Sequence, residues 1–353
     1  MIRRLAALSV SALALAAPAL ADVPRVATDI LPVHSLAAKV MEGLGRPDLI
    51  VPAGASPHGY ALRPSEAGAL ERAELVIWVG EGLMPQLAGS IETLAGDAAV
   101  LELMALDTSV KRPFREGATF EKHGHADDGD HEHEHGDDDH EHGHDTQAHD
   151  DHADGGHDHG DDDHGDHAGH DDHAHGAEDP HAWLDPENGK AWLDAIAAAL
   201  SQADPENAGT YYANAAAGKA ELDALKAEIT ETLAPVQEAD YIVFHDAYQY
   251  FEARFGISAA GSISLADASD PSAARIAEIR DKVAELGVRC VFSEPQFDAG
   301  LVAAVFEGAE AETAVIDPLG IGLEPGPALY PALLRDLSRD MAACLAGERD
   351  KDQ

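Results

Sequence analysis

A long run of histidine and acidic residues interrupts the middle of the chain. Between His123 and His175 the sequence holds 17 His, 20 Asp plus Glu and no Lys or Arg, and alanine is its only apolar residue. Such a segment buries too little apolar surface to offset the entropy of ordering it. We therefore expect residues 122–178 to form a disordered loop, and the packed part of the molecule to come from the sequence on either side.

The start of the chain has the pattern of a secretory signal peptide. Arg3 and Arg4 precede an apolar run, and Ala19 and Ala21 stand before a cut ahead of Asp22. No cysteine lies near that cut, so we expect no lipid anchor. Removal of residues 1–21 would leave an exported protein, most simply in a bacterial periplasm.

The net charge of the chain limits the classes of molecule that it can bind. The formal net charge is -43, and outside residues 123–175 the chain still has 46 acidic residues against 23 basic ones. An acidic surface repels phosphate backbones and anionic lipid, so nucleic acid is excluded as a partner.

Short apolar runs alternate with helical patterns on both sides of the tract. The runs that predict buried strands are 23–30, 48–54, 74–80 and 98–104, and later 241–244, 257–263, 289–294 and 313–318. Helical patterns cover 33–45 and 64–74 in the first part, and 249–256, 271–287, 298–311 and 331–347 in the second. This alternation predicts α/β structure with mostly parallel sheets.

A long helix is expected between the two parts. Asp185 and Asp204 are each followed by proline, the pattern of an N-cap with proline at the first helical position. The second of these helices would run to about Leu233, a length of roughly 40 Å. We expect a first lobe from 22–121 plus 179–203, a linker helix over 204–234 and a second lobe over 235–353.

Four histidines lie outside the tract. His58, His181 and His245 stand in loops or at strand ends, as does Asp298, whereas His34 suits a purely structural role. Three imidazoles and one carboxylate are a suitable set for tetrahedral Zn²⁺. Each residue also has a plainer explanation, because loop histidines are usually hydrogen-bonded surface residues and Asp298 can cap a helix.

The tract itself has two interpretations. It matches the metalloprotease pattern H-E-x-x-H at His131–His135 and at His140–His144, but that mechanism needs a helix that this composition does not favour. The tract is either an inert acidic spacer or a flexible segment that captures metal ions, and its histidine content favours capture.

The two cysteines, Cys290 and Cys344, suggest a disulfide in an oxidising compartment, with two buried thiols as the alternative.

The sequence resembles a known family at several places. The stretches SPHGY, DPHAWLDP, DPENAGTYYAN, FHDAYQYF and CVFSEPQF are together similar to the zinc-specific solute-binding proteins of bacterial ABC importers, the ZnuA type. The resemblance covers essentially all of the mature chain. It implies two lobes with four-stranded parallel sheets, a rigid joining helix and a metal in the cleft between the lobes.

The resemblance also implies roles for individual residues. His58 and His181 would be ligands from the first lobe, and His245 from the second. Asp298 would be the fourth ligand, with water as the alternative, since Pro57 stands where some relatives carry a Glu. Cys290 and Cys344 match the disulfide of zinc members.

The expected function is therefore a monomeric, non-catalytic periplasmic zinc receptor that delivers zinc to a membrane permease, with the tract capturing further zinc. Two alternatives stay open from the residues alone. One is a zinc hydrolase with Glu294 as its base, and the other is a periplasmic metal buffer with no transport partner.

Overall fold

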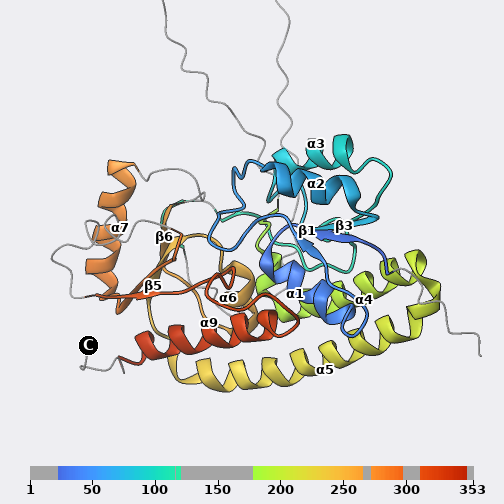
Figure 1. The fold of residues 1–353 in the computed structure, drawn as a ribbon. Coiled ribbons are helices and arrows are strands. Elements are labelled where there is room, and N and C mark those ends of the chain that lie inside the picture. Colours follow the sequence, from blue (N-terminus) through green and yellow to red (C-terminus); the bar gives the residue numbers. More distant parts are fainter. Residues whose placement is uncertain (1–22, 116, 121–177, 265–271, 297–310, 348–353) are drawn as a thin grey trace, which may run out of the picture. The chain divides into compact units, whose positions relative to one another are not determined.

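The computed structural model describes residues 23–115, 117–120, 178–264, 272–296 and 311–347 (Figure 1). The predicted signal peptide, the His-rich tract and residues 297–310, which include Asp298 and the helix expected there, lie outside these residues.

Two four-stranded parallel sheets form the framework. The first contains β1 (Val26–Thr28), β2 (Asp48–Leu49), β3 (Leu75–Trp78) and β4 (Ala99–Glu102) in the order β2-β1-β3-β4. The second contains β5 (Tyr241–His245), β6 (Gly261–Ser264), β7 (Cys290–Ser293) and β8 (Glu312–Val315) in the order β6-β5-β7-β8. The same order in both sheets confirms the predicted α/β fold with two similar lobes, which we call the first and the second lobe.

The central strands of both sheets are fully buried. Every residue of β1, β3, β5 and β7 is buried, as expected for parallel strands covered on both faces. The helices of the first lobe are α1 (Leu31–Val40), α2 (Pro64–Arg72) and α3 (Pro85–Leu94). In the described residues of the second lobe, the helices are α6 (Gln249–Phe255), α7 (Ala273–Leu286) and α9 (Leu329–Leu345).

Two helices follow the tract in the chain. In α4 (Pro186–Ala203) the Asp185 side chain accepts a hydrogen bond from the Glu187 amide at 2.9 Å, so the predicted N-cap is confirmed. The next helix begins differently from its prediction. Residues Pro205–Asn207 form a 3₁₀ turn, and α5 runs over Ala208–Leu233. The cause is local, because the Asp204 side chain accepts from the amide of Asn207 and tightens that turn.

Helix α5 joins the lobes through one apolar stripe. Its buried residues are Tyr211, Ala215, Gly218, Leu222, Leu225, Ile229 and Leu233, spaced three or four apart on one face. That face packs on α1 and α4 and also on α9, so one helix contacts elements of both lobes (Figure 1). The predicted joining helix is thus present, and it links the two lobes that carry the candidate histidines.

A disulfide closes the second lobe. Cys290 at the start of β7 is bonded to Cys344 near the end of α9, as predicted. Among the described residues, no helix has the length and apolar character needed to cross a bilayer.

Candidate metal centre

The end of the second sheet is the natural place for a ligand. In this sheet β5 is followed along the chain by β6 on one side and by β7 on the other. Ligands of open parallel sheets bind beyond the carboxyl ends of the strands at such a reversal of strand order. His245 is the last residue of β5, and Glu294 directly follows β7. The topology therefore brings these two side chains together.

The loop that carries His58 is held from both sides. The side chain of Gln86, in α3, donates to the carbonyl oxygens of Pro57 and Tyr60, each at 3.3 Å. The Tyr60 hydroxyl donates to the Glu66 carboxylate in α2 at 2.8 Å. The loop is thus tied to both helices that flank it, and this positions the partly buried His58 side chain.

His181 is oriented by a buried carboxylate. Oδ1 of Asp179 lies 2.7 Å from Nδ1 of the His181 ring and also accepts from the His181 amide at 3.0 Å. The Asp179 side chain is 1% exposed. Because Nδ1 contacts this carboxyl group, Nε2 is the ring nitrogen that faces the cluster, and it is the candidate metal-binding atom of His181.

His245 has a matching partner on the neighbouring strand. Its Nδ1 lies 2.5 Å from Oε1 of Glu294, whose other oxygen accepts from the side chain of Gln296 at 2.6 Å. Burial raises the pKa of Glu294 well above its usual range. A cation on Nε2 of His245 would favour the ionised form of this carboxyl, so metal binding and the carboxylate support each other.

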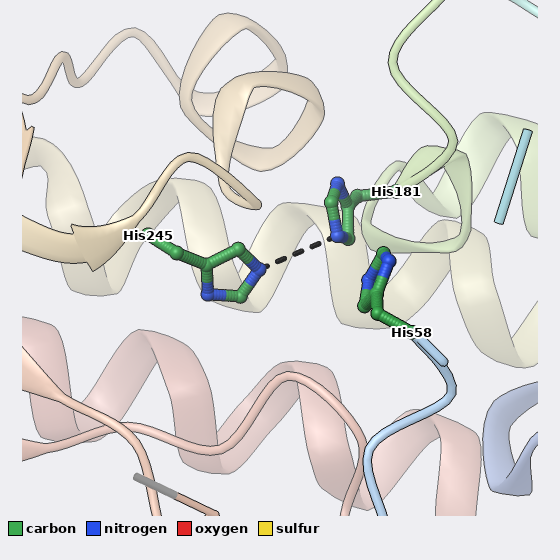
Figure 2. Close-up of side chains that lie close together, drawn as sticks. All are labelled: His58, His181 and His245. Carbon is green, nitrogen blue, oxygen red and sulfur yellow. Dashed lines mark hydrogen bonds between the residues drawn. The ribbon is translucent and has the colours of Figure 1, made fainter. Parts of the chain in front are cut away.

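The three imidazoles meet at one point. Each offers one ligand nitrogen, and these atoms all lie within 4.8 Å of one another. Figure 2 shows the rings turned toward a common centre from three separate segments of the chain. Nε2 of His181 and Nε2 of His245 are 3.4 Å apart. Two nitrogens bonded to one tetrahedral Zn²⁺ are also about 3.4 Å apart, given Zn–N bonds of about 2.0–2.1 Å. The spacing of this pair therefore suits a shared ion.

The electrostatics favour metal ligands over protonated histidines. Burial lowers the pKa of His58 and of His245 well below its usual value, and the neighbouring His181 lowers it further. A neutral imidazole is the form that binds a metal. At neutral pH these two imidazoles are therefore in the form that binds a metal, and the carboxyl groups of Asp179 and Glu294 lie beside the cluster, where they would offset the charge of a divalent ion.

The structure separates the other predicted residues. His34 lies in α1 outside this cluster, with its Nε2 3.2 Å from the carbonyl oxygen of Pro47, which agrees with a structural role. Asp298 lies outside the described residues. In the described part of the chain, the three histidines are the one group of three or more potential ligands that meet this closely.

Sequence reasoning missed the orienting roles of two residues. Asp179 stands two residues before a candidate ligand, and Glu294 was considered only as a base for hydrolysis. A signal was present for Glu294, since it directly follows an apolar strand, as His245 ends one.

Comparison with known proteins agrees with this geometry. Residues 26–344 match the family model described as ZnuA, zinc-uptake complex component A, periplasmic. The chain belongs to this family. The predicted family is therefore confirmed, and with it the prediction that the chain is a transport component and not an enzyme.

Relatives match along nearly their whole length. The high-affinity zinc uptake system protein ZnuA of Brucella suis is 45% identical over 321 residues, which are 91% of each chain. The protein of the same description from Paracoccus denitrificans is 46% identical over 334 residues, 94% of this chain and 95% of that one.

Solved structures of low identity share the fold. A crystal structure of ZnuA has a TM-score of 0.67 at 21% identity, covering 92% of this chain and 100% of the other. A zinc-bound ZnuA deletion mutant has a TM-score of 0.67 at 22% identity, covering 92% and 98%.

Proposed function

We propose that this chain is the periplasmic zinc-binding component of an ABC uptake system, and that His58, His181 and His245 hold one Zn²⁺ between the lobes for delivery to a membrane permease. The observation that carries this is the convergence of three imidazoles whose ligand atoms lie within 4.8 Å of one another. The family and its zinc-uptake relatives support zinc as the cargo.

Imidazoles suit zinc better than a hard cation. Nitrogen ligands favour Zn²⁺, whereas Mg²⁺ and Ca²⁺ prefer sets of oxygen atoms. A fourth position remains for an oxygen ligand. We keep Asp298 in that position, with water as the alternative, because the described ligands number three and zinc sites are usually four-coordinate.

A zinc hydrolase is not supported. Glu294, the residue considered as its base, is held by the His245 ring and by Gln296. Its carboxylate is buried and engaged in orienting a ligand, and the family is one of uptake components. The same membership favours a transport role over a buffer with no partner.

The finer organisation follows the sequence. We propose that residues 1–21 are a cleaved signal peptide and that the mature protein is a monomer. We also propose that the lobes comprise 22–121 with 179–203 and 235–353, joined by the linker over 204–234. We also propose that the tract, residues 122–178, captures additional zinc and raises its concentration near the cluster, since pairs of imidazoles in His-rich sequences bind transition metals at modest affinity.

Titration calorimetry with Zn²⁺ tests the site. Alanine at His58, at His181 or at His245 should each weaken the tight site at least about tenfold, because each removes one of three protein ligands. Alanine at His34 is the matched control and should leave the affinity unchanged. Tight binding that survives all three substitutions would refute the site.

A second variant separates the tract from the cluster. Replacement of the 17 histidines between 123 and 175 by asparagine keeps the length and the acidic charge. This tract variant should retain one tight zinc and lose the weaker equivalents. Loss of the tight site would place it in the tract and contradict the proposal.

A further inference from the structure

The segment that leads into the tract is bound to both lobes. We call residues 110–120 the crossing segment; residue 116 is outside the described part. At its start, the Val110 amide donates to Oδ1 of Asn188 at 2.7 Å, next to the start of α4. At its end, the Phe120 amide donates to the carbonyl of Ala260 at 2.9 Å and the Ser262 amide donates to the carbonyl of Ala118 at 3.0 Å. The segment thus forms an isolated antiparallel bridge to β6, between Thr119 and Gly261, at the edge of the second sheet.

The second lobe is shaped to receive this segment. A Cβ at Gly261 would lie 2.3 Å from the carbonyl oxygen of Ala118, so only glycine permits the approach. Ala118 is 3% exposed and packs in the same apolar cluster as Ile242 of β5 and Ile279 of α7. The crossing segment is therefore part of the core of the second lobe.

Arg115 is the polar anchor of the crossing segment. Its Nε donates to both carboxylate oxygens of Asp246, at 2.9 and 3.0 Å, and its Nη2 also contacts this carboxylate. Its Nη1 donates to Glu252 of α6 at 2.6 Å. The guanidinium lies 3.9 Å from the centre of the Phe120 ring. The side chains of Arg115, Asp246 and Glu252 are 10%, 4% and 2% exposed, so the contacts form in a low-dielectric setting where they are strong.

The residue that Arg115 contacts is the chain neighbour of a candidate ligand. Asp246 directly follows His245, the last residue of β5. The crossing segment also reaches the support of His181, because the Asp179 amide donates to the carbonyl of Arg112 at 2.8 Å. The side chain of Gln249 donates both to Pro113, at 3.0 Å, and to Asp179, at 3.3 Å. One segment therefore touches the surroundings of ligands from both lobes.

We infer that Arg115 is a positioning residue of the zinc site: by holding Asp246 against the crossing segment, it keeps the end of β5 where His245 can share an ion with His58 and His181. The inference rests on the proposed function, since it assumes that these histidines bind zinc. It assigns a role in zinc binding to a residue outside the set of candidate ligands.

A purely structural role gives a different expectation. If Arg115 only neutralises two buried carboxylates, its loss lowers the stability of the fold but leaves the affinity of the folded molecules unchanged. If it positions His245, affinity and coordination geometry change even where the protein is fully folded. Zinc affinity and the visible spectrum of bound Co²⁺, which reports ligand geometry, distinguish the two roles.

All proteins in the test carry the histidine-to-asparagine replacements of the tract variant. In this background, the protein with the natural Arg115, called wild type here, is compared with R115Q, R115K and a matched control. Each is measured at a temperature where circular dichroism shows it to be folded. R115Q should weaken zinc binding about tenfold, the lower end of the effect of residues that support metal ligands, and should alter the Co²⁺ spectrum. R115K keeps the charge but not the two-pronged contact, and should bind about threefold more weakly than wild type.

The control is R254Q. Arg254 makes a similar two-pronged contact with the buried Asp185, through Nε and Nη2 at 2.8 Å each, but Asp185 lies four residues from His181. Its affinity should stay within about twofold of wild type, as expected for a more distant site.

The outcomes are separable. Wild-type affinity and an unchanged Co²⁺ spectrum in folded R115Q would overturn the inference, and so would an equal loss in R254Q. If R115Q does not fold, R115K takes its place, and wild-type affinity in R115K would overturn the inference. Failure of wild type itself to bind zinc tightly, or tight binding in His245→Ala, would instead overturn the proposed function.

Discussion

Glu294 and Asp179 contact two of the candidate ligands on the side away from the centre of the histidine cluster. Each contacts the Nδ1 of its histidine, at 2.5 and 2.7 Å, and so turns Nε2 toward the centre of the cluster. A carboxylate in this position fixes the orientation of the ring and increases the electron density on the metal-binding nitrogen. The site therefore depends on residues beyond its ligands.

Glu294 offers a direct test at this scale. Glu294→Ala should lower zinc affinity about 10- to 100-fold, whereas Glu294→Gln should cost less, because its amide oxygen can still accept from the His245 ring. Competition titration with a zinc chelator measures both. Glu228→Gln, at an exposed carboxylate on α5, is the control. An alanine variant with wild-type affinity would show that the ring needs no support.

Asp29 directly follows β1 in the first lobe, as Glu294 directly follows β7 in the second. Unlike Glu294, its carboxylate contacts backbone amides and not a histidine ring. Its carboxylate accepts from the amides of Ile30, at 2.8 Å, and Val79, at 2.7 Å, and so joins the ends of β1 and β3. Burial raises its pKa to about 7, even though these two amide donors act to lower it. The folded state therefore binds this proton more tightly than the unfolded chain does.

This pKa predicts a pH dependence of stability. Because the folded pKa is above the unfolded value of about 4, the free energy of unfolding falls as pH rises from about 4 to 7, by on the order of 4 kcal/mol, and then levels off. Urea unfolding of wild type and Asp29→Asn at several pH values isolates this contribution. The stability of wild type minus that of Asp29→Asn should fall as pH rises from about 4 to 7, because only wild type carries this titrating group, and a constant difference would contradict the shifted pKa.

At the scale of elements, local patterns predicted most of the fold. Proline after Asp185 marked the start of α4, and the apolar runs marked the central strands, because these signals lie within a few residues of each other. The 3₁₀ turn before α5 was missed, since it depends on which amide the Asp204 side chain reaches.

The candidate site was predictable only in part. The histidines stood out as the four outside the tract, but Glu294 and Arg115 act through partners distant in sequence. Asp179 is only two residues from His181, but the sequence does not show that its side chain turns back onto that ring. Only the fold shows that Arg115 reaches Asp246, because 131 residues separate them along the chain.

Two glycines of α5 differ in how closely other atoms pack against them, so substitutions at the two positions should differ in their effect on stability. A Cβ at Gly218 would lie 2.9 Å from the Leu193 side chain of α4, whereas none of the atoms around Gly209 would lie within 4 Å of its Cβ. Gly218→Leu should therefore lower the free energy of unfolding by about 1–3 kcal/mol through overpacking. Gly209→Leu, on the same helix, should leave stability unchanged or slightly raised. Urea denaturation compares them, and equal effects would show that α4 moves aside at little cost.

At the scale of the molecule, the site joins parts that the chain separates. His58 and His181 are attached to elements around the first sheet, and His245 belongs to the second. A bound ion adds a link between the lobes beside the one made by α5. Ligand binding stabilises only the folded state that presents all three nitrogens, so the gain extends to the whole cooperative unit.

Zinc should therefore raise the unfolding temperature of the whole protein, and ligands from either lobe should be needed for the effect. With free zinc at about 1,000 times the dissociation constant, the gain in the free energy of unfolding is about 4 kcal/mol.

The tract variant is the right background for this measurement, because histidines that bind zinc in the unfolded chain would reduce the shift. His58→Ala and His245→Ala should each lose most of it in scanning calorimetry. His34→Ala should start at a lower temperature, since it removes a buried ring, yet keep the full zinc-induced shift. A full shift in His58→Ala would mean that the second lobe binds the ion without the first, and the shared site between the lobes would be wrong.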